Sequence, residues 1–262
     1  TSGEISEVPA KVSYNGISIN HWGMPWKSWR LELEGATYRG MSSVLLVMPR
    51  SDTQLENWLG NEMARRLGGI LTPDSEFVHF RLNGALNGVR LLQEPANQDF
   101  LKRRNLPAGK IFHGDITTAQ IYDNVRRERL FSEQSGWELK HAASSDQSEA
   151  EVQRLIDVVQ RLHNPYDFYY QLPEVIEVGA LLRYMALLEI VSSVHIDETH
   201  NWKLYLNPAT NRFEPIVFNT VAYYWKNTKS IDLAPNDLFR VVLSNPGLRE
   251  AVSAVGQAPQ AR

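Results

Sequence analysis

Residues 193–205 read SVHIDETHNWKLY and place Asp197 four residues before Asn201. The preceding segment, 174–194, is mostly apolar and predicts a buried helix, whereas 202–206 predicts a strand. The polar side chains therefore lie in a loop between two rigid elements, where binding and catalytic groups are often found. A carboxylate that orients a hydroxyl and an oxygen ligand for magnesium are parts of a phosphoryl-transfer site, so this segment indicates that chemistry.

A hairpin is predicted directly after this loop. Its strands are 202–206 and 213–218, and turn residues separate them. In protein kinases, the catalytic Asp and the Asn that follows it precede a further metal-binding Asp by one hairpin. Asn219 occupies the corresponding position in this chain.

The predicted secondary structure changes character near Pro95. The predicted elements are strands within 10–48, a helix at 52–67, strands at 77–82 and 88–92, helices at 98–105, 146–163, 174–194 and 235–255, and the hairpin at 202–218. Residues 106–145 show no clear pattern. We therefore predict an α+β, bilobal, protein-kinase-like fold, with a strand-rich lobe at 1–95 and a mainly helical lobe at 96–262 that contains the catalytic-loop-like segment.

Two local patterns make finer predictions. The helix at 52–67 is predicted to have one apolar face, formed by Leu55, Trp58, Leu59 and Met63. Asn83-Gly84 and Asn87-Gly88 both have turn chemistry, and we expect them in the connection between the strands at 77–82 and 88–92.

The composition excludes several classes of function. The chain has 262 residues, of which 43% are hydrophobic and 22% charged, as in ordinary globular proteins. Its net charge of −3 gives no indication of a nucleic-acid partner. Cysteine is absent, which excludes disulfides, zinc–thiolate sites and cysteine nucleophiles. The longest apolar stretch, 184–194, is too short to cross a bilayer, so we predict no membrane span.

Four sequence blocks and the loop after them resemble the CotH-type atypical protein kinase family, from about Val12 to Phe239. The blocks are Pro25-Trp-Lys-Ser-Trp-Arg30, Leu82-Asn-Gly84, Gly88-Val89 through Glu94, and Phe100-Leu-Lys-Arg-Arg104. All four occur in the family's order. The segment from Asp197 through His200-Asn201 and the hairpin after it continue the resemblance.

The resemblance implies ATP- and Mg²⁺-dependent phosphorylation of Ser or Thr on a protein substrate. Asp197 would position the hydroxyl, and Asn201 and Asn219 would face the metal. The chain begins at Thr1, which is compatible with removal of a signal peptide, and the resemblance favours an exported or cell- or spore-surface location over a cytoplasmic one.

Three further residues are assigned to the nucleotide site by the resemblance. Lys27 would hold phosphate, and Glu62 would pair with Lys27 as helix glutamates do in kinases. Glu94 would lie in the linker near the adenine ring. Lys27 as a solvated strand residue and Glu94 as an exposed carboxylate are the structural alternatives.

The departures from the family pattern favour a second hypothesis. Phe218 replaces the family's Trp, Asn219 replaces its metal-binding Asp, Val221 replaces a second acid, and Asn15 stands where the family tends to have Arg. An amide oxygen brings no negative charge to offset a magnesium ion. The chain would then be a catalytically inactive pseudokinase that acts as a binding or surface-assembly module.

Other interpretations of these residues remain open. Asp197 is also suited to closing a loop, as Asp often does. His195-x-Asp197 resembles the start of a facial-triad iron site, but no histidine follows His200 to complete it. A carbohydrate-binding or adhesive surface protein is a third hypothesis, which depends only on the aromatic content.

Overall fold

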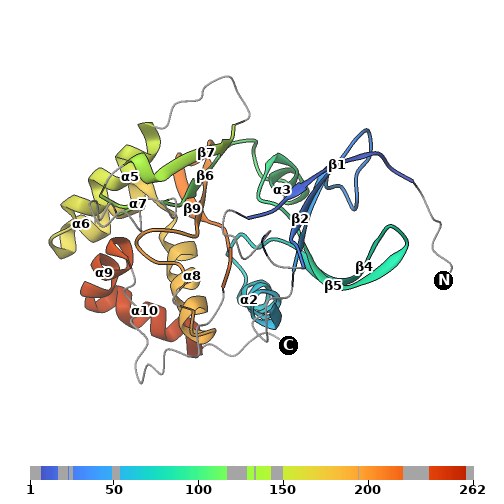
Figure 1. Ribbon diagram of the computed structural model, residues 1–262. Coiled ribbons are helices and arrows are strands. Elements are labelled where there is room, and N and C mark those ends of the chain that lie inside the picture. The colour runs from blue at the N-terminus through green and yellow to red at the C-terminus, as the bar shows by residue number, and fades with distance from the viewer. Residues whose placement is uncertain are drawn as a thin grey trace. The chain divides into compact units, whose positions relative to one another are not determined.

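The computed structural model describes residues 7–16, 23, 26–48, 54–116, 129–132, 134–142, 150–193, 195–220 and 236–257. These residues form an α+β structure with two antiparallel sheets, as the sequence predicts (Figure 1). By its internal contacts the chain divides into two compact units. Unit 1 comprises Thr1–Ser51 and Asp74–Pro95, and unit 2 comprises Asp52–Pro73 and Ala96–Arg262.

Unit 1 is a five-stranded sheet in the order β1-β2-β3-β5-β4. Its strands are β1 (Ala10–Tyr14), β2 (Trp29–Leu33), β3 (Ser43–Val47), β4 (Ser75–Leu82) and β5 (Ala85–Gln93). The core of the sheet is formed by Met41, Val44, Leu46 and Leu92. The central strand β3 is almost entirely buried, because its Val-Leu-Leu-Val run offers apolar side chains to both faces.

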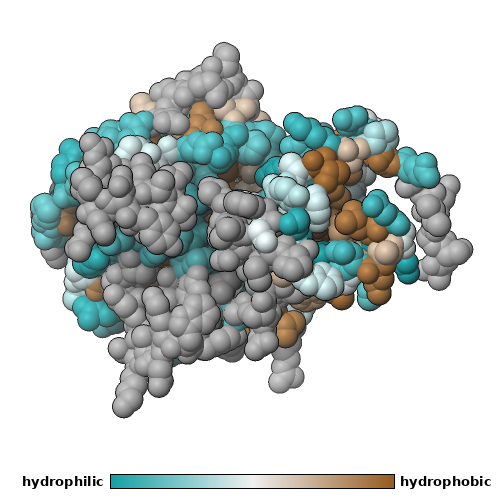
Figure 2. All heavy atoms as spheres, in the orientation of Figure 1, coloured by the Kyte–Doolittle hydropathy of each residue, from teal (hydrophilic) through white to brown (hydrophobic). Residues whose placement is uncertain are grey.

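Several apolar side chains of unit 1 remain exposed on the surface. They include Val12 on β1 and Phe77, Leu82, Leu86 and Val89 on the β4–β5 hairpin. Figure 2 shows brown, hydrophobic surface in this part of the molecule.

The β4–β5 hairpin confirms one predicted turn and corrects the other. Asn83 and Gly84 both have positive φ, at 51° and 80°, which is the backbone that a tight hairpin turn requires. Asn87-Gly88, in contrast, lies inside β5, where the pairing register with β4 shifts. Asn87 and Gly88 lie opposite the single residue Phe80, so β5 has one extra residue and forms a bulge, in which Gly88 takes a left-handed φ of 83°.

Unit 2 contains a four-stranded sheet in the order β7-β6-β8-β9 and all the described α-helices. The strands are β6 (Lys110–Gly114), β7 (Trp137–His141), β8 (Trp202–Asn207) and β9 (Arg212–Pro215). The helices are α2 (Gln54–Leu67), α3 (Gln98–Arg103), α5 (Ala150–Arg161), α6 (Pro165–Tyr170), α7 (Leu172–Val175), α8 (Val178–Ile190), α9 (Asp237–Ser244) and α10 (Pro246–Gln257). Helices α8 and α10 lie side by side (Figure 1).

The predicted hairpin at 202–218 is confirmed as β8 and β9, but the helix predicted before it is interrupted. Ile176 is extended and bridges Phe213 of β9, and the N–H of Glu177 donates to the carbonyl of Phe213 at 2.8 Å. Backbone that pairs with a strand cannot continue a helix, so α7 and α8 are separate. The predicted helix at 235–255 is likewise divided, because Asn245 ends α9 and its side chain accepts from Leu248 in α10.

The predicted apolar face of helix α2 is buried only in part, since Trp58 and Met63 are half-buried. Leu55 and Leu59 are 62% and 47% exposed, whereas Gly60 and Ala64 are buried. A β-carbon at Gly60 would overlap the side-chain oxygen of Thr220, so the helix makes a close contact with the segment after β9. Small residues are required at such a contact. Met63 and Leu67 of the same helix are partly buried and pack against the core of unit 2.

Candidate functional site

The loop between α8 and β8 is organised around one oxygen of Asp197. Its Oδ1 accepts hydrogen bonds from the N–H of Thr199 (2.7 Å), the hydroxyl of Thr199 (2.9 Å) and the N–H of His200 (3.0 Å). The carbonyl of Asp197 accepts from the indole N–H of the fully buried Trp202 at 3.0 Å. Asp197 therefore closes the loop, as the structural alternative expects. Its second oxygen, Oδ2, has no hydrogen-bond partner among the described residues and remains able to accept a hydroxyl.

Asp197 also forms an ion pair with His200, whose Nδ1 lies 2.6 Å from Oδ1. Burial acts to raise the pKa of Asp197, but the hydrogen bond and charge of His200 and the hydrogen bonds from Thr199 outweigh it, so this pKa is lowered. Burial acts to lower the pKa of His200, but the hydrogen bond to Asp197 and the charges of Asp197 and Asp115 raise it overall. The carboxylate is therefore ionised, and the imidazolium is favoured beside it.

Asn201 and Asn219 are brought together by the hairpin, as the sequence predicts. The Nδ2 of the buried Asn201 donates to the carbonyl of His195 at 2.8 Å, which turns its Oδ1 towards Asn219. The Nδ2 of Asn219 then donates to this Oδ1 at 3.1 Å. Both residues have left-handed backbone, with φ of 69° and 50°, a conformation that Asn tolerates better than most residues.

This arrangement does not fit a magnesium ion. Magnesium requires oxygen ligands and usually one or two carboxylates, whereas here an N–H₂ group of Asn219 faces the only oxygen that Asn201 presents. Among the residues that the structure describes, no group of three or more His, Asp or Glu side chains could hold a metal ion. Val221, where the family pattern has a second acid, lies outside the described residues.

Three residues beside the loop were not identified from the sequence. Asp115 follows β6 and lies along the loop. The residue before it, Gly114, pairs with Trp202 in the sheet, and the N–H of the residue after it, Ile116, donates to the carbonyl of Thr199 at 2.7 Å. Its pKa is raised, first by burial and also by the charge of Asp197, against the opposing charge of His200. No sequence signal marks Asp115, because the strand before it was not predicted.

His113 and Lys203 flank Phe218, the residue before Asn219. The ammonium of Lys203 lies 3.8 Å from the centre of the Phe218 ring, and the ring of His113 meets it edge-on at 5.9 Å. Burial, together with the charges of Lys203 and Lys140, lowers the pKa of His113 to about 3, so this histidine is neutral. A cation over the face of Phe218 adds positive charge close to the two asparagines.

In unit 1, Lys27 and Glu94 have defined surroundings. The ammonium of Lys27 lies over the ring of Tyr14, 5.5 Å from its centre. Glu94 is 1% exposed, which corrects the alternative that it is an exposed carboxylate. Its Oε2 accepts from the N–H of Asp74 at 2.9 Å, so it joins the ends of two segments of unit 1.

Glu62 belongs to α2 in unit 2, and its carboxylate forms an ion pair with Arg65 one turn later. The assignments of Lys27, Glu62 and Glu94 to nucleotide remain predictions.

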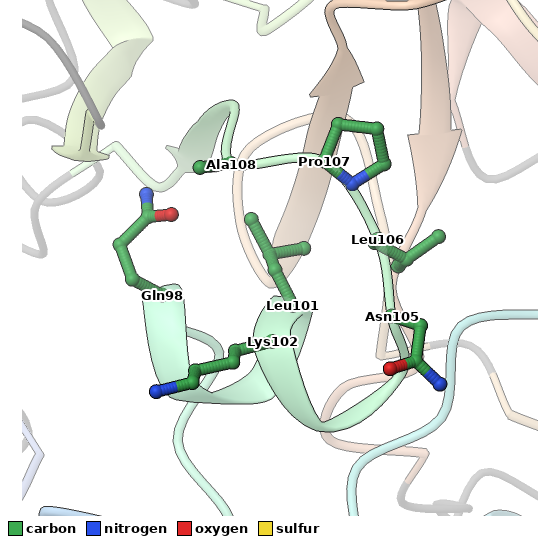
Figure 3. Close-up of a pocket in the computed structure, with 7 residues that line it drawn as sticks. All are labelled: Gln98, Leu101, Lys102, Asn105, Leu106, Pro107 and Ala108. Carbon is green, nitrogen blue, oxygen red and sulfur yellow. The ribbon is translucent and has the colours of Figure 1, made fainter.

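A surface hollow of about 620 Å³ lies elsewhere in unit 2, along α3. Figure 3 shows Gln98 and Lys102 of α3 on one side and Asn105, Leu106 and Pro107 on the other. None of the predicted site residues lines it, so the hollow is separate from the Asp197 loop.

Comparison with known proteins supports the family resemblance of the sequence. The family model described as "CotH kinase protein" matches residues 12–257, which is most of the chain. The chain belongs to the CotH family. Inner spore coat protein H of Bacillus subtilis (strain 168) is 26% identical over 209 residues, which cover 78% of this chain and 56% of that protein. The chain therefore spans little more than half the length of this CotH relative.

Membership of the CotH family supports the sequence resemblance, and the loop gives it structural detail. The family assignment covers both units, from β1 to α10. No helix among the described residues is long and apolar enough to cross a membrane.

Proposed function

We propose that this CotH-family chain is a pseudokinase-type domain, which binds nucleotide and a partner protein but transfers phosphate poorly. The observation that carries the proposal is the hydrogen bond from the amide of Asn219 to the amide of Asn201. In the family pattern an acid stands at position 219. Without it, Mg²⁺ lacks charge compensation, and positioning and charge compensation are most of what a protein contributes to phosphoryl transfer.

The proposed fold of this domain is bilobal and kinase-like, with lobes at 1–95 and 96–262. In it, Lys27 holds phosphate and Glu94 lies near the adenine ring. The name of the Bacillus relative indicates a spore coat, so we propose a surface-assembly partner and an exported or spore-surface location.

An active Ser/Thr protein kinase is the second candidate, and a specific observation favours it. Asp197 is ionised and about one-third exposed, and its Oδ2 has no partner among the described residues. A carboxylate in this state is suited to orient a substrate hydroxyl. The second candidate differs from the first in the rate of transfer, with the same binding residues.

The deciding experiment combines binding and turnover. Calorimetry with ATP, with and without Mg²⁺, should give weak binding with little gain from the metal. Labelled-phosphate transfer to a generic Ser/Thr-rich protein, and to the chain itself, should remain near background. Rapid transfer together with strongly Mg²⁺-dependent binding would reject the pseudokinase in favour of the active kinase.

A further inference from the structure

Arg90 of β5 is a fully buried cation that lies between two aromatic rings of unit 1. The centre of its guanidinium is 5.4 Å from the ring centre of Trp26 and 5.3 Å from that of Phe80, and the residue is 1% exposed. Its Nη1 donates to the carbonyls of Asn87 and Val89, and its Nη2 donates to Oδ1 of Asn87 at 2.7 Å. The guanidinium is therefore fixed in orientation.

The charge of Arg90 has an unusual environment. Within the described part of the chain, no carboxylate forms an ion pair with it, and its buried Nε has no hydrogen-bond partner. Burying a cation on carbonyl dipoles and ring faces alone opposes folding, and a neutral residue at this position would avoid that cost. The arrangement is better explained by what Arg90 holds in place.

Arg90 holds Trp26, which also lies directly on the backbone of the bulge. A β-carbon at Gly88 would lie 3.1 Å from the Trp26 ring, and Gly88 has a φ of 83°, so position 88 needs glycine for both reasons. Trp26 is nevertheless 47% exposed, so burial of its ring does not account for the contact by itself. The stacking on Arg90 fixes a half-exposed ring in one position.

The residues after Trp26 are anchored to other segments of unit 1. Lys27 lies over the ring of Tyr14, which packs against Trp29 with ring centres 5.0 Å apart. Ser28 is fully buried, its hydroxyl accepts from the N–H of Met48 at 3.0 Å, and its carbonyl accepts from the N–H of Asn15 at 2.9 Å. Lys27 is thus the residue between two fixed points, Trp26 and Ser28.

We propose that Arg90 and Trp26 are positioning residues for Lys27. The inference rests on the proposed function, in which Lys27 holds the phosphates of a nucleotide. A lysine on a fixed backbone loses less conformational freedom when it binds phosphate, so the clamp of Trp26 on Arg90 raises affinity without touching the ligand.

The test compares ATP with adenosine, because Lys27 acts on the phosphates alone. Calorimetry on Lys27→Ala should show at least about tenfold weaker ATP binding, the loss expected for a charge-assisted hydrogen bond. Arg90→Gln and Trp26→Ala should each weaken ATP binding by about three- to tenfold and leave adenosine binding unchanged. Trp26→Phe, which keeps a ring for the guanidinium, should recover most of the affinity. Arg81→Gln is the matched control, since Arg81 is on the same hairpin and its one hydrogen bond among the described residues is to the carbonyl of Gly84.

The double variant Lys27→Ala/Arg90→Gln separates a positioning role from a structural one. If Arg90 acts through Lys27, the double variant should bind ATP no more weakly than Lys27→Ala alone. Fully additive losses would overturn the inference, and so would wild-type affinity in both Arg90→Gln and Trp26→Ala. If Arg90→Gln does not fold, equal affinities of Trp26→Ala and Trp26→Phe overturn it. Unchanged ATP binding in Lys27→Ala would instead reject the nucleotide role of Lys27 in the proposed function.

Discussion

The side-chain N–H₂ of Asn219 donates a 3.1 Å hydrogen bond to the side-chain oxygen of Asn201, which lies 18 residues earlier. Because both side chains leave left-handed backbone, Asp can replace Asn at either position with little strain. The hydrogen bond fixes two amides where the family pattern has an amide and an acid.

Asn219→Asp is expected to restore a magnesium site. The substitution removes the donor that faces Asn201, brings two oxygens together and adds one negative charge, with almost no change in volume. Nucleotide binding should become dependent on Mg²⁺, and phosphoryl transfer should rise by at least about tenfold over wild type if the other elements are intact.

The matched control for this substitution is Asn211→Asp. Asn211 lies in the turn of the same hairpin, is exposed and also has left-handed backbone, with φ of 55°. It should change neither Mg²⁺ dependence nor transfer. If Asn219→Asp binds Mg-ATP well but stays inactive, other parts of the site have been lost, and the binding-module function is supported.

Asp197→Ala is expected to have two separable effects. In the Asn219→Asp background it should abolish transfer, because the substrate hydroxyl loses its positioning carboxylate. In the wild-type background it should lower the free energy of unfolding by roughly 1–3 kcal/mol, because the loop loses its hydrogen bonds to Oδ1. Urea denaturation measures the second effect. A variant as stable as wild type would show that the loop does not depend on Asp197.

The ion pair of Asp197 and His200 predicts a pH-dependent contribution to stability. His200 has a raised pKa, so its contribution is complete below about pH 6.5 and is lost as the pH rises through its folded-state pKa. Asp197 has a lowered pKa, so its contribution is complete above about pH 3.9 and is lost as the pH falls through its folded-state pKa. The pair should therefore stabilise most between about pH 4 and 6.5.

His200→Gln tests this window when it is compared with His113→Gln. The loss of unfolding free energy in His200→Gln should be roughly 1–3 kcal/mol near pH 5.5 and smaller near pH 9. His113 has a pKa lowered to about 3 in the folded protein. As the pH falls below about 6.5, the unfolded state gains a proton at this histidine that the folded state does not, so His113 increasingly opposes folding. Its replacement should become less harmful towards low pH. The same pH trend in both variants would contradict the assignment of the two histidines.

Gly60→Ala is expected to destabilise the protein by about 1–3 kcal/mol, because the new methyl group overlaps Thr220 and forces α2 away from it. Thermal unfolding followed by circular dichroism measures this change. Gly256→Ala in α10 is the control, since among the described residues its β-carbon would meet only Ile190, at 4.0 Å, and it should be neutral or slightly stabilising. Equal melting temperatures for the two variants would exclude the tight contact.

The local features of the site were predictable from the sequence, and the long-range ones were not. The loop, the hairpin and the proximity of Asn201 to Asn219 follow from short spacings along the chain. Strand β6 was missed because it is central in its sheet and buried on both faces, so it lacks the alternation that marks a strand. Asp115 was missed with it.

Contacts between distant segments explain the remaining differences. The close approach of Gly60 in α2 to Thr220 is not indicated by the apolar pattern of the helix. In the sequence Arg90 has the pattern of an ordinary strand arginine, and its contact with the ring of Trp26 is seen only in the structure. Neither relationship has a signature within a single stretch of sequence.

Helix α2 belongs to unit 2, although its sequence lies between two segments of unit 1, so the chain passes between the units three times. No single cleavage can divide the protein into its two units. A fragment that starts at Ala96 would lack Ala64, which is part of its core, and Leu71, whose carbonyl accepts from the N–H of Val217 at 2.8 Å. Such a fragment should be recovered in folded form only when a peptide of residues 52–73 is co-expressed or covalently joined to it.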